Sequence, residues 1–134
     1  MTYKHKVQYY ETDKQGVTHH SNYIRFMEET RVDAMEKMGF GYERMEEAGI
    51  FSPVMSVSCD YKRPTTFPDE VEIELSVAEL SRLKARFAYK MTVGEKVVCT
   101  ASSLHCFLDK TGRPVSIEER FPEFYNALTE LLER

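Results

Sequence analysis

Residues 70–77 carry the pattern that most restricts how this chain can fold. Apolar side chains at Val71, Ile73, Leu75 and Val77 alternate with glutamate or serine at every position between them. Because successive side chains of a β-strand point to opposite faces, this alternation predicts a strand with one face in a hydrophobic core and the other in water. A sheet of such strands must cover its apolar face with a second layer of structure.

Comparable runs follow one another along the chain with short connections. We predict strands within five segments: residues 4–11, 53–61, 70–80, 83–93 and 96–108. The segment V-G-E-K at residues 93–96 offers a tight hairpin link between the last two. Long strands joined this closely favour one antiparallel sheet of about five strands.

The second layer is predicted to be a long amphipathic helix at residues 21–38. Apolar side chains recur there at three- and four-residue steps, charged side chains fill the other positions, and Gly39 follows as a stop. A short helix can follow at residues 42–49, and a helical period returns in residues 118–134, where Pro122 suits an early helical position. We therefore expect an α+β protein whose five-stranded sheet packs on the long helix, with another helix at the C-terminus.

Length and charge limit the class of protein. The 134 residues suffice for one domain with a core and are too few for two, so residues 1–134 are expected to form a single domain. The formal net charge is -4, whereas nucleic-acid-binding proteins typically carry an excess of basic residues. With no apolar signal core and no stretch near the length of a membrane span, we expect a cytoplasmic protein without a membrane span. Three separate cysteines without a CxxC motif indicate reduced core thiols.

Residues 9–31, YYETDKQGVTHHSNYIRFMEETR, gather the side chains able to do chemistry. Two carboxylates and two adjacent histidines surround Gly16, directly before the long helix. The free N–H groups and positive dipole end of a helix start can stabilise negative charge on an oxygen atom. Zinc motifs on helices place histidines four residues apart, whereas these two are adjacent and no second cluster supplies ligands, so no metal is expected.

This segment resembles the 4-hydroxybenzoyl-CoA thioesterase family, in particular its acyl-CoA thioesterases associated with the Tol-Pal gene cluster. The matching pattern is Y-x-E-T-D-x-x-G-V-x-x-H-x-x-Y over residues 9–23, followed by Phe26, Glu28 and Arg31 on the helix. The resemblance implies a hotdog fold, in which a five-stranded antiparallel sheet wraps around a long helix, and acyl-CoA thioesterase activity. It also implies a homodimer with a continuous sheet and active sites at the interface, or a homotetramer made of two such dimers.

The resemblance also implies roles for single residues. Asp13 matches the catalytic aspartate, which acts either as a nucleophile that forms a mixed anhydride or as a general base on water. The backbone amide of His20 matches the oxyanion donor, and the His20 side chain occupies the family's histidine position. We expect the substrate to be contacted by Gly16, Val17, His19, Tyr23 and Glu28, of which His19 is a pocket-lining candidate only.

Coenzyme A is part of the expected substrate, and no separate cofactor is expected. Its phosphates call for cations near the pocket, and the candidates are Lys62 and Arg63 or the segment SRLKAR at residues 81–86. The family's basic residues fall in the second of these, so we expect Arg82 and Lys84 to bind CoA, although such a turn can also be merely solvated. The acyl group, and whether CoA or acyl carrier protein carries it, are left open by the sequence.

Two other functions are weighed against the thioesterase. Hotdog hydratases or dehydratases show an Asp-x-Asn-Pro-x-His pattern, which the residues after Asp13 do not match. A non-catalytic acyl-binding hotdog protein would not need the Asp13 carboxylate. Two residues nearby are interpreted as structural: Arg31, as the partner of Glu28 in a local ion pair, and His105, as a satisfied strand residue.

Overall fold

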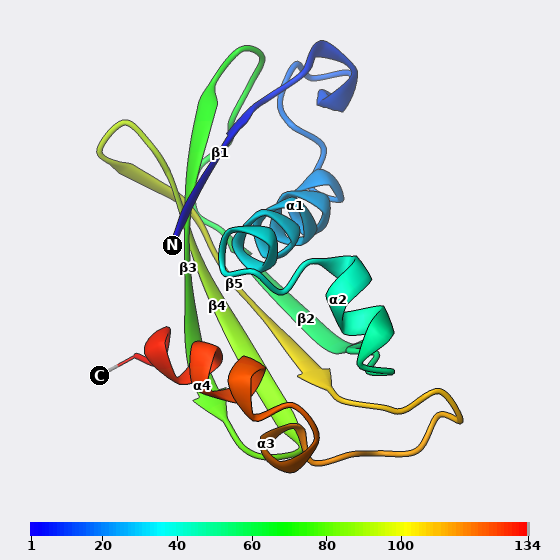
Figure 1. Ribbon diagram of the computed structural model, residues 1–134. Coiled ribbons are helices and arrows are strands. Elements are labelled where there is room, and N and C mark those ends of the chain that lie inside the picture. Colours follow the sequence, from blue (N-terminus) through cyan, green and yellow to red (C-terminus); the bar gives the residue numbers. More distant parts are fainter. Residues whose placement is uncertain (134) are drawn as a thin grey trace.

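A computed structural model describes residues 1–133 and consists of one antiparallel sheet with its helices gathered on one side (Figure 1). The elements in chain order are β1 (Thr2–Lys6), α1 (Asn22–Lys37), α2 (Tyr42–Glu47), β2 (Val54–Tyr61), β3 (Glu70–Leu80), β4 (Lys84–Val93), β5 (Lys96–Cys106), α3 (Ile117–Arg120) and α4 (Pro122–Glu130). The five strands are ordered β1-β3-β4-β5-β2. The predicted α+β architecture, with a long helix against a five-stranded antiparallel sheet, is confirmed.

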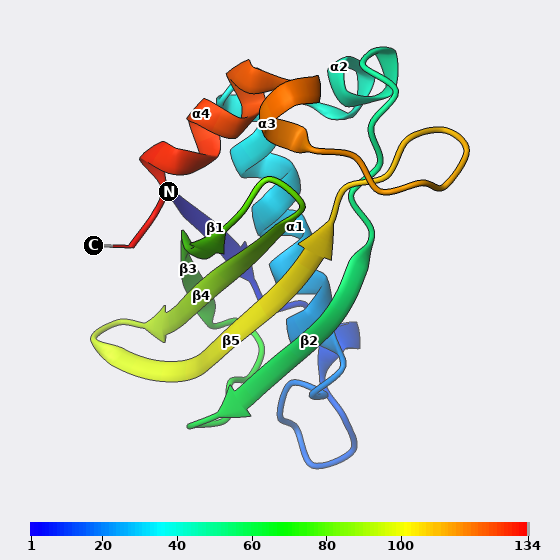
Figure 2. The same cartoon turned by 90° about the horizontal axis from the view of Figure 1, so that it is seen from below.

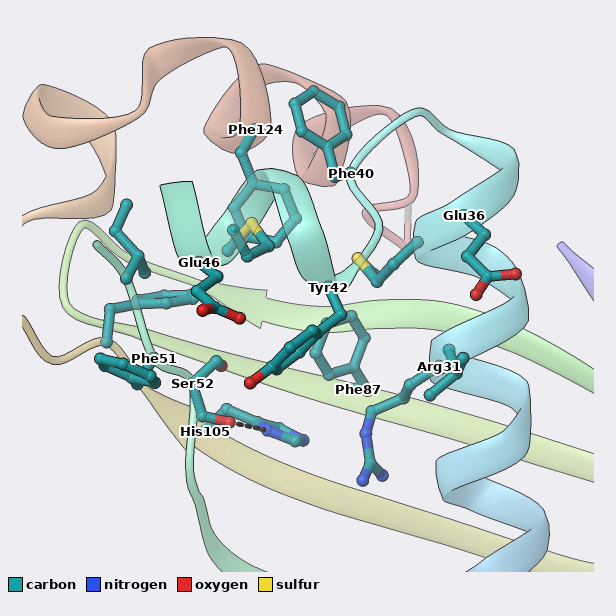
Figure 3. A pocket seen from close by; sticks show the side chains of 15 residues that line it. Arg31, Glu36, Phe40, Tyr42, Glu46, Phe51, Ser52, Phe87, His105 and Phe124 are labelled. Atoms are coloured by element: carbon teal, nitrogen blue, oxygen red, sulfur yellow. Dashed lines mark hydrogen bonds between the residues drawn. The ribbon is translucent and has the colours of Figure 1, made fainter. Parts of the chain in front are cut away.

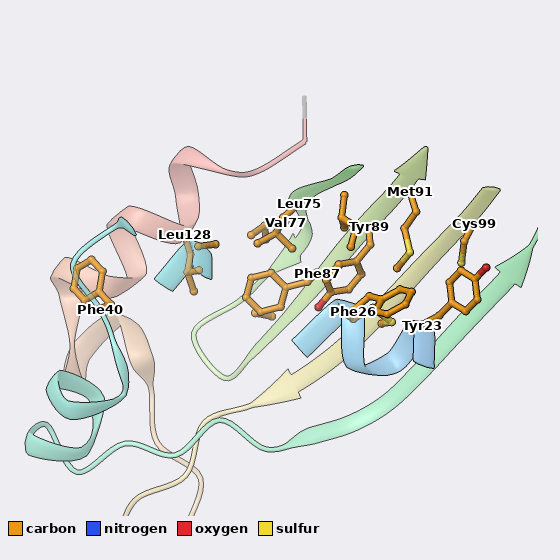
Figure 4. Packing of buried hydrophobic residues seen from close by; sticks show 14 of the residues in the cluster. Tyr23, Phe26, Phe40, Leu75, Val77, Phe87, Tyr89, Met91, Cys99 and Leu128 are labelled. Atoms are coloured by element: carbon orange, nitrogen blue, oxygen red, sulfur yellow. The ribbon is translucent and has the colours of Figure 1, made fainter. Parts of the chain in front are cut away.

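The core lies between α1 and the sheet, which curves around the helix (Figure 2). The prediction that β3 has one buried and one exposed face is confirmed. Val71, Ile73, Leu75 and Val77 are buried, while the glutamates between them are exposed. Phe26 of α1 packs toward the same layer as the β4 side chains (Figure 4). The apolar stripe of the helix and the apolar face of the sheet therefore bury each other.

The first strand is shorter than predicted. The strand pattern was expected to continue to residue 11, but β1 ends at Lys6 and Tyr9–Glu11 form a single turn of 3-10 helix. The Glu11 carboxylate accepts the N–H of Gln8 at 2.7 Å, which closes the turn. This local capping bond competes with extended structure and wins, and it directs the chain toward α1.

The C-terminal helix is divided in two, where one helix was predicted. The hydroxyl of Ser116 accepts the N–H of Glu119 and caps α3, and the backbone leaves helical geometry at Phe121, with φ -144°. Pro122 then starts α4, because proline has no N–H to continue α3 but fits a first helical position. The last residue of the predicted helix, 134, lies outside the described residues.

Strand β2 forms an edge of the sheet and is exposed along nearly its whole length. It pairs with β5, and its other edge pairs with no strand among residues 1–133. Val57 is 41% exposed and Met55 50% exposed. A long edge strand with exposed apolar side chains is a surface that another strand can cover.

Two smaller expectations concern cysteines and membranes. Cys59, Cys99 and Cys106 are free thiols, of which Cys99 is buried and the other two are half-buried. Only one of the three thiols lies deep in the core, and the expectation that they are reduced stays a prediction. Across residues 1–133, no helix has both the length and the hydrophobicity that a bilayer crossing requires.

Candidate active site

Residues 12–21 form a closed loop before α1, which we call the Asp13 loop. The N–H of Asp13 donates to the carbonyl of Val17 at 2.8 Å, and the N–H of Gly16 donates to the carbonyl of Asp13 at 3.0 Å. Gly16 has φ +82°, in the left-handed region that glycine adopts without a steric penalty. The predicted turn at Gly16 is therefore present and sets the shape of the loop.

One side of the Asp13 loop is anchored to the connection after β2. The buried hydroxyl of Thr65 lies 2.6 Å from that of Thr18 and 2.9 Å from that of Tyr23, and the Thr18 N–H donates to the Thr65 carbonyl. Thr66 donates its hydroxyl to the Gly16 carbonyl at 2.6 Å. These bonds hold the loop at a fixed place on the sheet, and they place Tyr23 beneath the loop as a support.

The other side is anchored to β1 through Glu11. His5 lies between two carboxylates, with Nε2 2.8 Å from Glu11 Oε1 and Nδ1 3.2 Å from Glu29 Oε1. Glu11 is only 5% exposed, and its carbonyl accepts the N–H of His19 at 2.8 Å and the side-chain amide of Asn22 at 2.9 Å. Glu11 is thus a structural support for the loop and the helix start.

The Asp13 carboxylate is half-buried and uses only one of its oxygens in the loop. Oδ1 accepts the N–H of Gln15 at 2.8 Å, which is the turn-closing role that an aspartate commonly has in loops. No donor among residues 1–133 binds Oδ2. The second oxygen is therefore available to a substrate or a water molecule.

The backbone of His20 has the arrangement expected of an oxyanion donor. Helical geometry begins here, since the N–H groups of Asn22 and Tyr23 donate to the carbonyls of His19 and His20. Within residues 1–133 the His20 N–H has no acceptor, as expected for the first turn of a helix. Tyr61 at the end of β2 donates its hydroxyl to the His20 carbonyl at 3.1 Å, which fixes this peptide unit.

The two histidine side chains lie together on the surface. Although the side chains of neighbouring residues commonly point apart, the rings of His19 and His20 stack at 4.3 Å with an interplanar angle of 27°. A 2.8 Å hydrogen bond between His19 Nδ1 and the Ser21 hydroxyl draws the first ring toward the helix start, where the second one lies. Among residues 1–133, no three His, Cys, Asp or Glu side chains are grouped so that they could hold a metal ion.

The other predicted site residues are spread along the molecule. Val17 belongs to the Asp13 loop, and Glu28 is exposed on α1. Lys62 and Arg63 lie at the end of β2 that meets the loop. Arg82 and Lys84 lie at the β3–β4 turn, at the opposite end of the sheet from the loop in the same chain (Figure 1).

Arg31 does not make the predicted ion pair with Glu28, so that interpretation is wrong. Its Nη1 instead donates to the hydroxyl of Tyr89 on β4 at 3.0 Å. The side chain reaches under the helix toward the sheet, where a buried hydroxyl offers a better-shielded partner than an exposed carboxylate.

This arginine lines a cavity of about 340 Å³ between the second half of α1, α2 and the strands β4 and β5 (Figure 3). Its walls are mainly aromatic and thioether side chains, including Phe40, Phe87, Phe107, Met35 and Met45. The sequence did not predict this cavity, because its lining comes from segments that lie far apart along the chain. The one available signal was the alternation that puts Ser103, His105 and Phe107 on the same face of β5.

His105 forms the polar floor of this cavity and is 3% exposed. Its Nε2 lies 2.8 Å from the Ser103 hydroxyl and its Nδ1 3.4 Å from the Ser52 carbonyl, so the interpretation as a satisfied strand residue is confirmed. Burial, together with the positive charge of Arg31, lowers the pKa of His105 to about 4. The imidazole is therefore neutral at physiological pH.

A curved antiparallel sheet around one long helix, with a carboxylate loop at the helix start, defines a hotdog-type protein. The thioesterase-like superfamily matches residues 7–130. The chain therefore belongs to this family of thioester hydrolases, and both the predicted hotdog fold and the predicted class of enzyme are confirmed.

Solved structures and named relatives agree over most of the chain. A hypothetical protein from Aquifex aeolicus has a TM-score of 0.86 at 36% identity, covering 92% of this chain and 97% of that one. The DHNA-CoA thioesterase of Staphylococcus aureus has a TM-score of 0.89 at 30% identity, covering 96% and 88%. A 1,4-dihydroxy-2-naphthoyl-CoA hydrolase of Synechococcus elongatus is 25% identical over 88% of this chain and 89% of its own.

Proposed function

We propose that the protein hydrolyses an acyl-CoA thioester to a free acid and CoA, with the Asp13 loop as its reaction centre. The observation that carries this proposal is the free N–H of His20 at the start of α1, on the same anchored loop as the free Oδ2 of Asp13. One group can stabilise negative charge and the other can supply a nucleophile or a base, which are the two requirements of thioester hydrolysis. Membership of the Tol-Pal-associated branch stays a prediction.

The reaction can follow either of two routes from this geometry. Asp13 Oδ2 attacks the thioester carbonyl to form a mixed anhydride that water then cleaves, or it takes a proton from the water that attacks. Both routes place negative charge on the carbonyl oxygen, which the His20 N–H would stabilise. One such donor typically contributes about 3 kcal/mol to the stability of the transition state.

A second copy of the chain is proposed to complete the site. The exposed edge of β2 can pair with the same strand of another copy, which would cover Met55 and Val57 and give a continuous sheet. Across a two-fold axis, antiparallel pairing sets the C-terminal half of one strand against the N-terminal half of the other. Tyr61, which holds His20, would then face the other copy's Val54, two residues from Ser52 at the edge of its cavity.

The cavity beside Arg31 is accordingly proposed to take the acyl group that the other copy's Asp13 loop cleaves. In one chain the loop and the cavity lie near opposite ends of α1, whereas the two-fold pair would bring a loop and a cavity together. The same pairing would put Arg82 and Lys84 at the end of the joined sheet where the other copy's loop lies, consistent with their proposed contact to CoA phosphates. Lys62 and Arg63 are the alternative cations, on the same chain as the loop.

Asp13→Asn tests the reaction centre. The asparagine side chain keeps an oxygen that can accept the Gln15 N–H, so the loop should hold its shape while the nucleophile or base is lost. We expect release of free CoA from acyl-CoAs to fall by at least about a hundredfold, with an unchanged thermal unfolding midpoint. Undiminished turnover by this variant would contradict the assignment.

The same assay separates the thioesterase from the acyl-binding alternative. Wild-type protein should release thiol from some members of a graded panel of aliphatic and aromatic acyl-CoAs. Tight binding of an acyl-CoA without any thiol release across the panel would instead favour a binding protein, in which Asp13 only closes the turn with Gln15.

A further inference from the structure

The floor of the cavity is a chain of hydrogen bonds whose direction is fixed. A carbonyl only accepts, so His105 Nδ1 donates to Ser52, and the neutral ring leaves Nε2 as an acceptor for the Ser103 hydroxyl. The Ser103 oxygen in turn accepts from the Tyr89 hydroxyl at 2.7 Å, and Tyr89 accepts from Arg31. The hydroxyl groups of Tyr89 and Ser103 and the ring N–H of His105 thus each donate to another group of the protein.

Arg31 is the first donor in this series of hydrogen bonds. A guanidinium carries five N–H donors, and only a donation from Nη1 to Tyr89 is made within residues 1–133. No carboxylate in this part of the chain lies within ion-pair distance of it. The fixed hydrogen bond to Tyr89 orients the group, and its remaining donors have no partner among residues 1–133.

The surroundings of Arg31 are mainly apolar. Phe87, Phe107 and Phe51 line the cavity with Met35, and the buried His105 already uses its acceptor nitrogen for the Ser103 hydroxyl. Two exposed carboxylates, Glu36 and Glu46, also line the cavity, but neither makes an ion pair with Arg31 (Figure 3). A partly buried cation in an apolar cavity is favourable only when an opposite charge meets it. The cavity is thus a mainly apolar chamber, with one oriented cation on its sheet side and the exposed Glu36 and Glu46 on its helices.

We infer that Arg31 determines specificity in the acyl chamber, and that it selects acyl groups that carry a carboxylate at the end far from the thioester. This inference rests on the proposed thioesterase function. A carboxylate supplies both the missing charge and two oxygens that match the planar fork of a guanidinium, whereas a single hydroxyl supplies one neutral acceptor. The hydrogen-bonded floor would keep the fork in place before the substrate arrives.

Matched pairs of substrates test the inference. Suberyl-CoA is octanoyl-CoA with a carboxylate at its far end, and 4-carboxybenzoyl-CoA bears the same relation to benzoyl-CoA. We expect the wild-type protein to show a higher kcat/KM for the carboxylated member of at least one pair. Arg31→Met, which keeps the apolar stem, should reduce this preference about tenfold or more, chiefly by lowering kcat/KM for the carboxylated member.

A control variant comes from the same helix. Arg25 is exposed and makes no side-chain hydrogen bond or ion pair within residues 1–133, so Arg25→Met should keep the preference. Arg31→Lys keeps the charge without the planar guanidinium and should retain part of the preference for carboxylated substrates. This variant also tests the inference if Arg31→Met fails to fold. A wild-type protein that does not favour either carboxylated substrate, or an equal preference in wild type and Arg31→Met, would overturn the inference.

Binding of the free acids keeps this test separate from the proposed function. Suberate and terephthalate can be titrated calorimetrically into the wild-type and Arg31→Met proteins without any reaction. If no thioester is hydrolysed, the proposed function fails, while weaker binding of these acids to Arg31→Met would still support the role of Arg31. Equal binding to both proteins, or none to the wild type, would count against it.

Discussion

His105 stays neutral inside the protein because its surroundings disfavour a positive charge. Burial is the main cause, and the nearby guanidinium of Arg31 adds to it, so that the pKa of His105 falls from 6.5 to about 4. The Ser52 carbonyl opposes the shift only in part. The hydrogen-bonded floor of the cavity therefore keeps the same proton arrangement across the physiological pH range.

This shift makes the stability of the protein depend on pH. Between pH 4 and 6.5 the unfolded chain binds a proton at His105 that the folded chain does not, so the free energy of unfolding should fall as the pH falls through this window. The loss should be about 3 kcal/mol at most and should level off below pH 4. Urea unfolding at a series of pH values measures it.

His105→Gln removes the titrating group and should flatten the stability curve in this window. A His105→Gln protein with the same pH dependence as the wild type would show that other groups cause it.

At the scale of elements, the connection between β1 and α1 carries the site. Glu11 is buried beside His5, and its backbone holds both the Asp13 loop and the first residue of α1. The packing of the His5 ring on Phe26 at 4.1 Å joins this cluster to the core. The position of the loop thus depends on a strand and a helix that contribute no reacting group.

His5→Ala should leave the buried Glu11 carboxylate with the N–H of Gln8 but without the imidazole that faces it. We expect a loss of about 3 kcal/mol in the free energy of unfolding, because an unpaired buried charge is costly. Chemical denaturation measures this loss. Combining the change with Glu11→Gln should cost less than the sum of the two single changes, since the variant pair no longer contains a buried charge. Strict additivity would mean that the two side chains do not interact.

The sequence predicted the elements well where a period was long and local signals agreed with it. The alternation in β3 and the stripe of α1 were such cases. The predicted end of β1 was wrong because the Glu11 carboxylate closes a local turn with the N–H of Gln8, which the alternating pattern did not reveal. The single C-terminal helix was wrong because Pro122 started a new helix. Helical spacing alone predicted an ion pair between Arg31 and Glu28. The observed partner of Arg31, the hydroxyl of Tyr89, lies far away in the sequence, so spacing could not reveal it.

The candidate site was predicted only in its local part. Residues 12–21 are close in sequence, so their turn, their glycine and the helix start could be interpreted together. The cavity, its neutral His105 and the anchoring by Thr65 join segments separated by long stretches of chain. No pattern in a single sequence specifies contacts of that kind.

At the scale of the whole molecule, the outer edge of β2 has no partner strand among residues 1–133. Val57→Lys would place a charge in the middle of the exposed edge of β2, at a position where the proposed partner strand should lie. We expect wild-type protein to sediment as a dimer or a larger assembly, and the variant to shift toward monomers with little loss of stability. Lys90, an exposed side chain on β4, offers the matched control Lys90→Glu.

The separation of the Asp13 loop and the cavity along α1 has a genetic consequence. If each reaction uses the loop of one copy and the cavity of another, two different inactive proteins can complement each other. Asp13→Asn lacks the carboxylate, and Met35→Trp should fill the cavity. Mixed dimers would contain one site with both defects and one with neither, so unfolding and refolding the two variants together should restore up to about half the wild-type activity per mixed dimer. Two sites that were each complete within one chain would give no such recovery.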